Sequence, residues 1–140
     1  MRRDPYEIAS FPLLLYTCNC TDCQRQTGSA FALNMPVRFA DFRILKGEPN
    51  GWNHTSPNGT AVISRFCGNC GTRLYGERGG RPETISLRAG ALDDTSWLVP
   101  VAHFLRAARS VGTTSARCGV FRNPAERLGK PAAWMACPLD

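Results

Sequence analysis

The chain has 140 residues, of which 43% are hydrophobic and 20% are charged, and its formal net charge at pH 7 is +6. This length suits one domain with its own core, and the hydrophobic content excludes a disordered chain. No apolar run reaches the roughly 18 residues that a membrane-spanning helix needs, and the first 16 residues do not form a signal peptide because acidic residues and proline interrupt them. We therefore expect a single-domain cytoplasmic protein with reduced cysteines.

Short strands separated by turns are predicted along most of the chain. Alternating or β-branched residues indicate strands at 6–8, 13–16, 31–35, 52–55, 60–66, 72–75 and 84–87, with looser alternation at 39–45. A short helical turn is predicted through Gln24 to Gln26, capped by Thr21 or Asp22 and ended by Gly28, and Pro36 is expected at a strand edge. Together these elements predict a mainly β fold with antiparallel sheets and few short helices.

The composition changes after residue 103. Residues 106–140 carry six basic residues against two acidic ones, a net charge of +4. Such a balance is typical of segments that bind nucleic acid or an anionic small molecule, but a basic tail with little packing is the simpler interpretation. Short helices are predicted at 104–109 and 124–128.

Five of the seven cysteines form two groups along the sequence. Cys18, Cys20 and Cys23 fall within six residues, and Cys67 and Cys70 follow downstream among turn-forming residues at the tip of a predicted hairpin. One-residue spacing does not suit a disulfide, whereas three thiolates can surround one metal ion with Zn–S bonds of about 2.3 Å. Zinc is favoured over an iron–sulfur cluster because the spacing lacks the cysteine runs typical of clusters. We predict all five cysteines as zinc ligands.

Two arrangements of the metal remain open at this point. One ion could bind Cys67, Cys70 and two thiols of the first group, which gives a closed structural site. Alternatively, Cys18, Cys20 and Cys23 hold one ion with an open fourth position, which water or a substrate thiol can occupy, while the second pair serves another ion.

The remaining cysteines and the histidines are interpreted as ordinary residues. Cys118 and Cys137 stand alone in the tail and are expected to be free thiols. His54 and His103 are each isolated, so we expect packed or surface residues and not ligands. Asp93 and Asp94 follow a turn, which they are expected to cap.

Three segments resemble the glutathione-dependent formaldehyde-activating enzyme (GFA) family, also described as the centromere protein V-like family. Residues 18–31 resemble its C-H-C-x-x-C-(Q/R)-R-x-x-G motif, and residues 65–72 are similar to its R-x-F-C-x-x-C-G segment. Residues 89–94, followed by Pro100 and His103, resemble its G-x-L-D-D…P…H stretch. The resemblance implies a β-tent fold over most of the chain.

The resemblance also implies roles for the cysteines. In this family the C-x-C-x-x-C thiolates hold a catalytic zinc, here on Cys18, Cys20 and Cys23. The later pair, here Cys67 and Cys70, joins an N-terminal C-x-C to close a structural zinc site.

The activity that the resemblance implies is a zinc-dependent carbon–sulfur lyase reaction. Its substrates would be glutathione or a related thiol and formaldehyde or another small electrophile, as in the synthesis of S-hydroxymethylglutathione. Arg25 or Arg65 could receive a glutathione carboxylate through a bidentate ion pair. The expected partner is then a small-molecule thiol, and no membrane or nucleic-acid partner is expected. Whether the protein forms a homodimer stays open.

The sequence departs from the family pattern at two points besides the tail. Asn19 replaces the histidine of the first motif, and the N-terminal C-x-C is absent, so the N-terminal part is expected to be clipped. We divide the chain into a GFA-like zinc-binding β domain at 1–105 and an atypical basic tail at 106–140. Two alternatives stay open: a zinc-ribbon-like module with only structural zinc that binds nucleic acid in a salt-dependent manner, and an inactive truncated relative.

Overall fold

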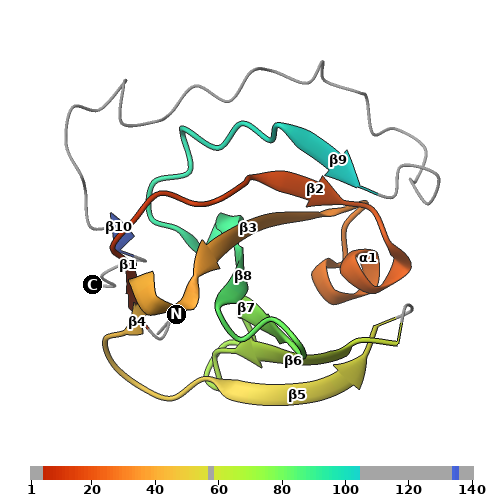
Figure 1. Ribbon diagram of the computed structural model, residues 1–140, viewed down its shortest axis with the longest axis horizontal. Helices are drawn as coiled ribbons and strands as arrows, with labels where there is room; N and C mark the ends of the chain where they lie inside the picture. The colour runs from red at the N-terminus through yellow and green to blue at the C-terminus, as the bar shows by residue number, and fades with distance from the viewer. Residues whose placement is uncertain (1–4, 57–58, 105–133, 136–140) are drawn as a thin grey trace.

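The computed structural model describes residues 5–56, 59–104 and 134–135 (Figure 1). The described strands are β1 (Tyr6–Ile8), β2 (Tyr16–Cys18), β3 (Ala32–Arg38), β4 (Phe42–Ile44), β5 (Asn50–Thr55), β6 (Ala61–Phe66), β7 (Arg73–Arg78), β8 (Thr84–Arg88), β9 (Ala102–Phe104) and β10 (Trp134–Met135). They are joined by the helix α1 (Thr21–Thr27) and the 3-10 turns η1 (Phe39–Asp41) and η2 (Ala89–Ala91). The predicted mainly β fold is confirmed.

The strands form two sheets. The larger sheet has the order β5-β6-β7-β8-β3-β2-β9, and the smaller one has the order β10-β1-β4. Neighbouring strands are antiparallel except for β2 and β9, which run parallel. Figure 1 shows that the larger sheet bends around β8, so that β9, β2 and β3 lie on one side and β7, β6 and β5 on the other. The helix α1 lies at the open end between these two sides.

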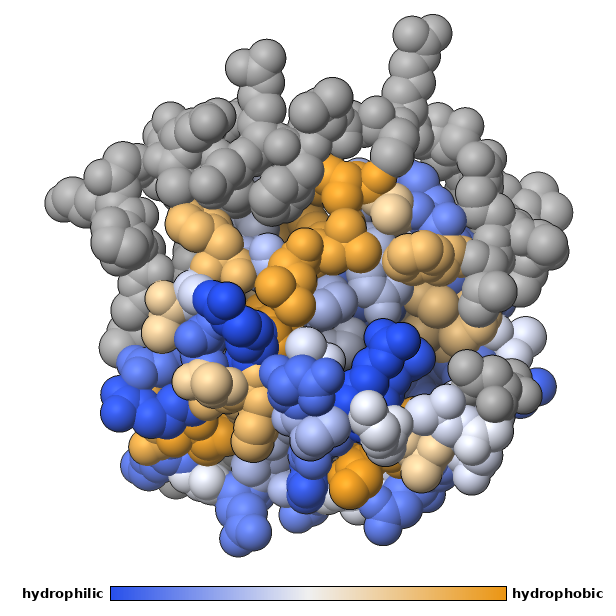
Figure 2. Space-filling view, in the orientation of Figure 1, coloured by the Kyte–Doolittle hydropathy of each residue, from blue (hydrophilic) through white to orange (hydrophobic). Residues whose placement is uncertain are grey.

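The two faces of the larger sheet differ in chemistry. On β8, Ile85 and Leu87 are buried in the core, whereas Ser86 and Arg88 point to the opposite face, because successive side chains of a strand alternate. The core also includes Tyr6 and other buried side chains from the smaller sheet and from the loops that cover it. In Figure 2, hydrophobic side chains form a band in the upper middle of the visible face, and hydrophilic side chains predominate below it.

A β-bulge on β7 changes which residues reach each face. Phe66 of β6 pairs with Arg73, while the preceding Arg65 pairs with Tyr75, so Leu74 is an extra residue in the ladder. Both Leu74 and Tyr75 are buried in the core. Because two consecutive side chains of a bulge lie on the same side, Arg73 is moved to the face opposite the core.

Two strand predictions are wrong in detail. The predicted strand at 13–16 is β2 in the structure, and it begins only at Tyr16 and runs into the first cysteine. Pro36 lies inside β3, where its carbonyl accepts a hydrogen bond from the Leu13 backbone at 2.9 Å. The N–H and C=O groups of one strand residue point to the same side, so the N–H that proline lacks would also have pointed toward Leu13, which precedes β2. Pro36 therefore removes no hydrogen bond from the ladder between β3 and β8.

Most of the predicted tail lies outside the described residues, including the predicted helix at 124–128 and both Cys118 and Cys137. The helix predicted at 104–109 would begin at Phe104, which ends β9 instead. Trp134–Met135 pairs with β1 as an antiparallel strand. Within the described ranges, no helix is long and apolar enough to cross a membrane.

The core face predicts the result of a matched pair of leucine substitutions. Leu87→Ala should lower the free energy of unfolding by about 2–5 kcal/mol, because it removes a fully buried side chain and leaves a cavity. Leu13→Ala removes a side chain that is 56% exposed, and should change stability by less than about 0.5 kcal/mol. Chemical denaturation of both variants tests the assignment, and equal losses would contradict it.

Candidate metal and substrate site

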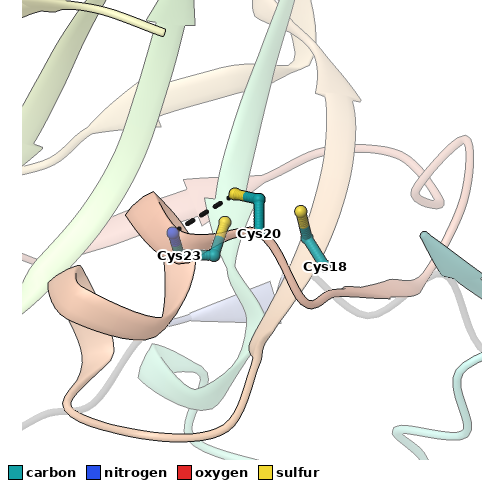
Figure 3. Close-up of side chains that lie close together, drawn as sticks. All are labelled: Cys18, Cys20 and Cys23. Carbon is teal, nitrogen blue, oxygen red and sulfur yellow. Dashed lines mark hydrogen bonds between the residues drawn. The ribbon is translucent and has the colours of Figure 1, made fainter. Parts of the chain in front are cut away.

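The three clustered cysteines are positioned by the junction between β2 and α1. Cys18 ends β2, Cys20 precedes α1, and Cys23 lies in its first turn. Cys20 is the N-cap: its backbone is extended, its carbonyl accepts from Gln24 N at 3.0 Å, and its Sγ accepts from Cys23 N at 3.3 Å (Figure 3). The predicted cap at Thr21 or Asp22 is therefore wrong, because a thiol takes the place of the usual oxygen.

The predicted end of this helix is correct. Gly28 is the C-cap in a left-handed conformation with φ 60°, and its N–H donates to the Gln24 carbonyl. Glycine takes this conformation without the steric cost of a Cβ atom.

The thiol groups of Cys18, Cys20 and Cys23 point toward one another (Figure 3), and their sulfur atoms all lie within 4.8 Å of one another. Tetrahedral zinc with Zn–S bonds of about 2.3 Å would hold its sulfurs about 3.8 Å apart, so the trio fits zinc after small side-chain adjustments. Among the described residues, no other group of three or more Cys, His, Asp or Glu side chains is this close. The cluster could therefore hold a metal ion through three thiolates.

The electrostatics of the cluster favour a thiolate on Cys23. A hydrogen bond with Cys18 lowers the pKa of the Cys23 thiol to about 5 despite its burial, and the positive charge of Arg88 acts in the same direction. The same hydrogen bond, together with burial, raises the pKa of Cys18. The first negative charge in the cluster is therefore held by Cys23, in the form that binds metals.

The cysteines line a cavity of about 420 Å³ on the concave face of the larger sheet. Ser64, Gly76 and Ser86 line this cavity from three adjacent strands, and Gly76 is the register partner of both serines. A Cβ atom at Gly76 would meet nothing closer than 3.9 Å, so this glycine leaves open space in the cavity. The further lining comes from the residues Tyr16, Asp22, Gln26, Asn34, His54, Ser56, Val62, Arg73, Arg78 and Arg88.

Arg88 connects the sheet to the helix that carries Cys23. Its Nη1 donates to Asn34 Oδ1 on the neighbouring strand β3, and its Nη2 donates to Gln26 Oε1 on α1 at 2.9 Å. The helix has no buried residue, so apolar packing does not anchor it. Polar contacts at its start add to the attachment, since Gln24 Nε2 donates to the Asn19 carbonyl at 2.8 Å and Asn19 Nδ2 donates to the Phe104 carbonyl at 3.0 Å.

Two further residues of the cavity were missed by the sequence prediction. Arg73 is half-buried, and burial followed by the charge of Arg88 lowers its pKa to about 10. His54, which was expected to be a packed or surface residue, stacks on Trp52 with ring centroids 4.3 Å apart. Its Nε2 atom lies 3.4 Å from Nε2 of Gln26. The only signal in the sequence for these two residues was the alternation of side chains along a strand. The bulge on β7 changes the face on which Arg73 lies, so alternation alone does not predict its place.

The arginines that the sequence offered for a substrate carboxylate lie elsewhere. Arg65 forms an ion pair with Glu77 at 2.7 Å, and Arg25 is exposed on α1. Neither side chain lines the cavity. Strand alternation explains this placement for Arg65, because it follows Ser64, which lines the cavity, and its register partner Tyr75 belongs to the core side of β7.

The second cysteine pair lies at the predicted hairpin tip. Cys67 is fully buried, and Cys70 Sγ lies 3.1 Å from Thr72 Oγ1. Within the described ranges, neither thiol joins the three-sulfur group, so the closed arrangement with thiols from both groups is not formed. Their binding of a second ion stays a prediction.

The other isolated residues have structural contacts. His103 Nδ1 lies 2.6 Å from Thr17 Oγ1 across the parallel pair of β2 and β9, outside the cavity. Asp94 accepts a hydrogen bond from Ser96 N at 2.9 Å, as expected for a turn cap.

The fold and the site define a mainly β protein whose bent sheet encloses a cavity with three cysteines that could hold a metal ion. The sequence profile of the family described as glutathione-dependent formaldehyde-activating enzyme, GFA, matches residues 5–108. The chain therefore belongs to the GFA family.

The same fold is found in a solved structure. It is the crystal structure of a Rhodobacter sphaeroides protein determined as a structural genomics target, with a TM-score of 0.52 and 22% sequence identity. The match covers 70% of this chain and 89% of that chain. No curated protein matches the sequence.

The role of Arg88 as an anchor predicts a local effect of its removal. Arg88→Met keeps a long side chain but removes the donors to Asn34 and Gln26, and hydrogen bonds from a charged group contribute about 1.5–3 kcal/mol each. Hydrogen exchange of the α1 amides should accelerate by about tenfold or more, while β3 and β8 stay protected. Arg65→Met, which loses only the pair with Glu77, should leave α1 unchanged. Equal acceleration of α1 in both variants would contradict the anchoring role.

Proposed function

We propose that this protein is a zinc-dependent carbon–sulfur lyase-type enzyme that acts on glutathione or a related thiol and on formaldehyde or another small electrophile. The observation that carries this proposal is the convergence of Cys18, Cys20 and Cys23 in the lining of a cavity of about 420 Å³. Membership of the GFA family supports the same activity.

The three thiols suit a metal that takes part in chemistry. Three thiolates would hold the ion and leave one position of a tetrahedral site without a protein ligand, whereas a structural zinc site is normally closed by four protein ligands. When bound, zinc would supply a positive charge that lowers the pKa of a nearby thiol and so makes it a better nucleophile at neutral pH.

The residues of the chain would bind and orient the substrates around this cluster. In the reaction, the thiol sulfur forms a bond to the carbonyl carbon, and the thiol proton ends on the carbonyl oxygen. Hydroxyl groups of Ser64 and Ser86 line the cavity and can hydrogen-bond a polar adduct. Arg88 would keep α1, and with it Cys23, in place during the reaction.

Zinc binding tests the ligand set. The protein purified without added metal should contain zinc, and Cys23→Ser should lose the ion of the three-sulfur cluster, because two thiolates do not hold it tightly. Cys70→Ser should retain this ion. Elemental analysis of the two variants and the parent checks the expectation, and loss of the same ion in both variants would favour a closed zinc-ribbon site.

Activity tests the proposed reaction. Zinc-loaded protein should accelerate the formation of S-hydroxymethylglutathione from glutathione and formaldehyde above the uncatalysed rate, as measured by exchange NMR. Cys20→Ala, with the fold checked by circular dichroism, should lose the acceleration. The absence of acceleration by the zinc-loaded parent protein would overturn the formaldehyde assignment.

Filling the cavity tests whether it is the substrate site. Gly76→Leu places a side chain into open space next to Ser64 and Ser86, so the fold and zinc content should persist while activity falls by at least about tenfold. Gly90→Leu is the matched control, because a Cβ atom there meets nothing within 4 Å and Gly90 does not line the cavity. Equal activity of the two variants would place substrate binding elsewhere.

A further inference from the structure

The cavity contains positive charge that forms no ion pair with a carboxylate of the described residues. The ion pairs found among the described residues involve Arg38, Arg43 and Arg65, and neither Arg73 nor Arg88 takes part in one. The Nε atoms of both Arg73 and Arg88 are buried and have no hydrogen-bond partner. A buried cation is costly unless an anion or hydrogen-bond acceptors compensate it.

The two arginines differ in their remaining contacts. Arg88 uses its other nitrogens to bind Asn34 and Gln26, so its guanidinium is fixed in place. Arg73 has no hydrogen bond or ion pair with any other described side chain, and the groups that act on its charge are Arg88, which repels it, and Cys23, which attracts it. An arginine stays protonated at neutral pH in such surroundings, so its donors are available to a ligand.

The bulge directs Arg73 into the substrate cavity. Because Leu74 and Tyr75 both enter the core, Arg73 lies on the same face of β7 as Gly76 and lines the cavity together with Cys23. The cavity therefore presents sulfur ligands and a guanidinium fork to the same bound molecule. Asp22 is the one carboxylate among the described lining residues, and it forms no ion pair with Arg73 or Arg88.

We propose that Arg73, supported by Arg88, binds the carboxylate of the thiol substrate, so that the site selects small thiols that carry a carboxylate over neutral thiols. The planar guanidinium matches a carboxylate through paired N–H···O bonds, and Cys23 marks the cluster at which the substrate sulfur would lie. This inference rests on the proposed function, in that it takes the bound molecule to be a thiol.

The test compares thiols that differ in charge. The zinc-loaded 140-residue protein is titrated by calorimetry with mercaptoacetate and 3-mercaptopropionate, and with 2-mercaptoethanol as the neutral probe. The parent protein should bind at least one carboxylate thiol about tenfold or more tightly than the neutral thiol, since a charge-assisted hydrogen bond contributes on the order of a tenfold change in affinity. Equal affinity of the parent for all three probes would overturn the proposal without any variant.

Substitutions assign the preference to a residue. Arg73→Gln should remove the preference for the carboxylate, and Arg73→Lys, which keeps the charge but loses the fork, should retain part of it. Arg65→Gln is the matched control, because Arg65 lies outside the cavity and should keep the full preference. Zinc content and thermal unfolding show that each variant is folded. An undiminished preference in Arg73→Gln would overturn the proposal, as would equal losses in Arg73→Gln and Arg65→Gln. Should Arg73→Gln not fold, Arg73→Lys decides in the same way, because an unchanged preference there would refute recognition by the fork.

The outcomes separate this inference from the proposed function. A carboxylate preference that depends on Arg73, without acceleration of the formaldehyde reaction, would support the anion subsite and refute the proposed reaction. Acceleration of the reaction with no dependence on Arg73 would support the reaction and refute the subsite.

Discussion

The contacts of Arg88 are the constraint on which the candidate site depends. The helix α1 carries Cys23 but has no buried side chain, so its position relative to the sheet is not fixed by a hydrophobic contact. The guanidinium joins Gln26 of this helix to Asn34 of β3, and its charge also favours the thiolate of Cys23. Because one cation both orients the helix and stabilises the metal-binding form of its cysteine, geometry and electrostatics of the cluster are coupled.

The two faces of the bent sheet have different roles: one packs into the core and stabilises the fold, and the other forms the candidate site. One face carries the apolar side chains of the core, and the other carries the cavity with its cysteines, serines and arginines. Strand alternation alone would have put Leu74 in the cavity with Gly76 and Arg78, and the bulge on β7 replaces it with Arg73. An apolar side chain is thereby removed from the cavity and a charged one is added. A single irregularity in the ladder thus adds one positive charge to the site.

The segment that resembles the GFA motif contains the cysteine cluster, whereas the charge around the cluster depends on which side chains the strands direct into the cavity. Arg25 and Arg65 stand close to the family motifs in sequence, which made them the candidates for a carboxylate. Their side chains nevertheless lie on the exposed helix surface and in an ion pair with Glu77. The arginines that line the cavity, Arg73, Arg78 and Arg88, come from β7 and β8, which a local motif does not bring together.

The sequence by itself determined the mainly β class, the family, the short helix with its glycine end and the three clustered cysteines, because strand alternation, the C-cap and the C-x-C-x-x-C spacing are all local. It did not determine that Cys20 caps the helix, that Pro36 is tolerated inside β3, or that Arg73 and Arg88 meet in the cavity. The last two features depend on which strands pair and in which register, and pairing brings together residues that are distant in the chain. The tertiary structure alone therefore decided the surroundings of the cysteines.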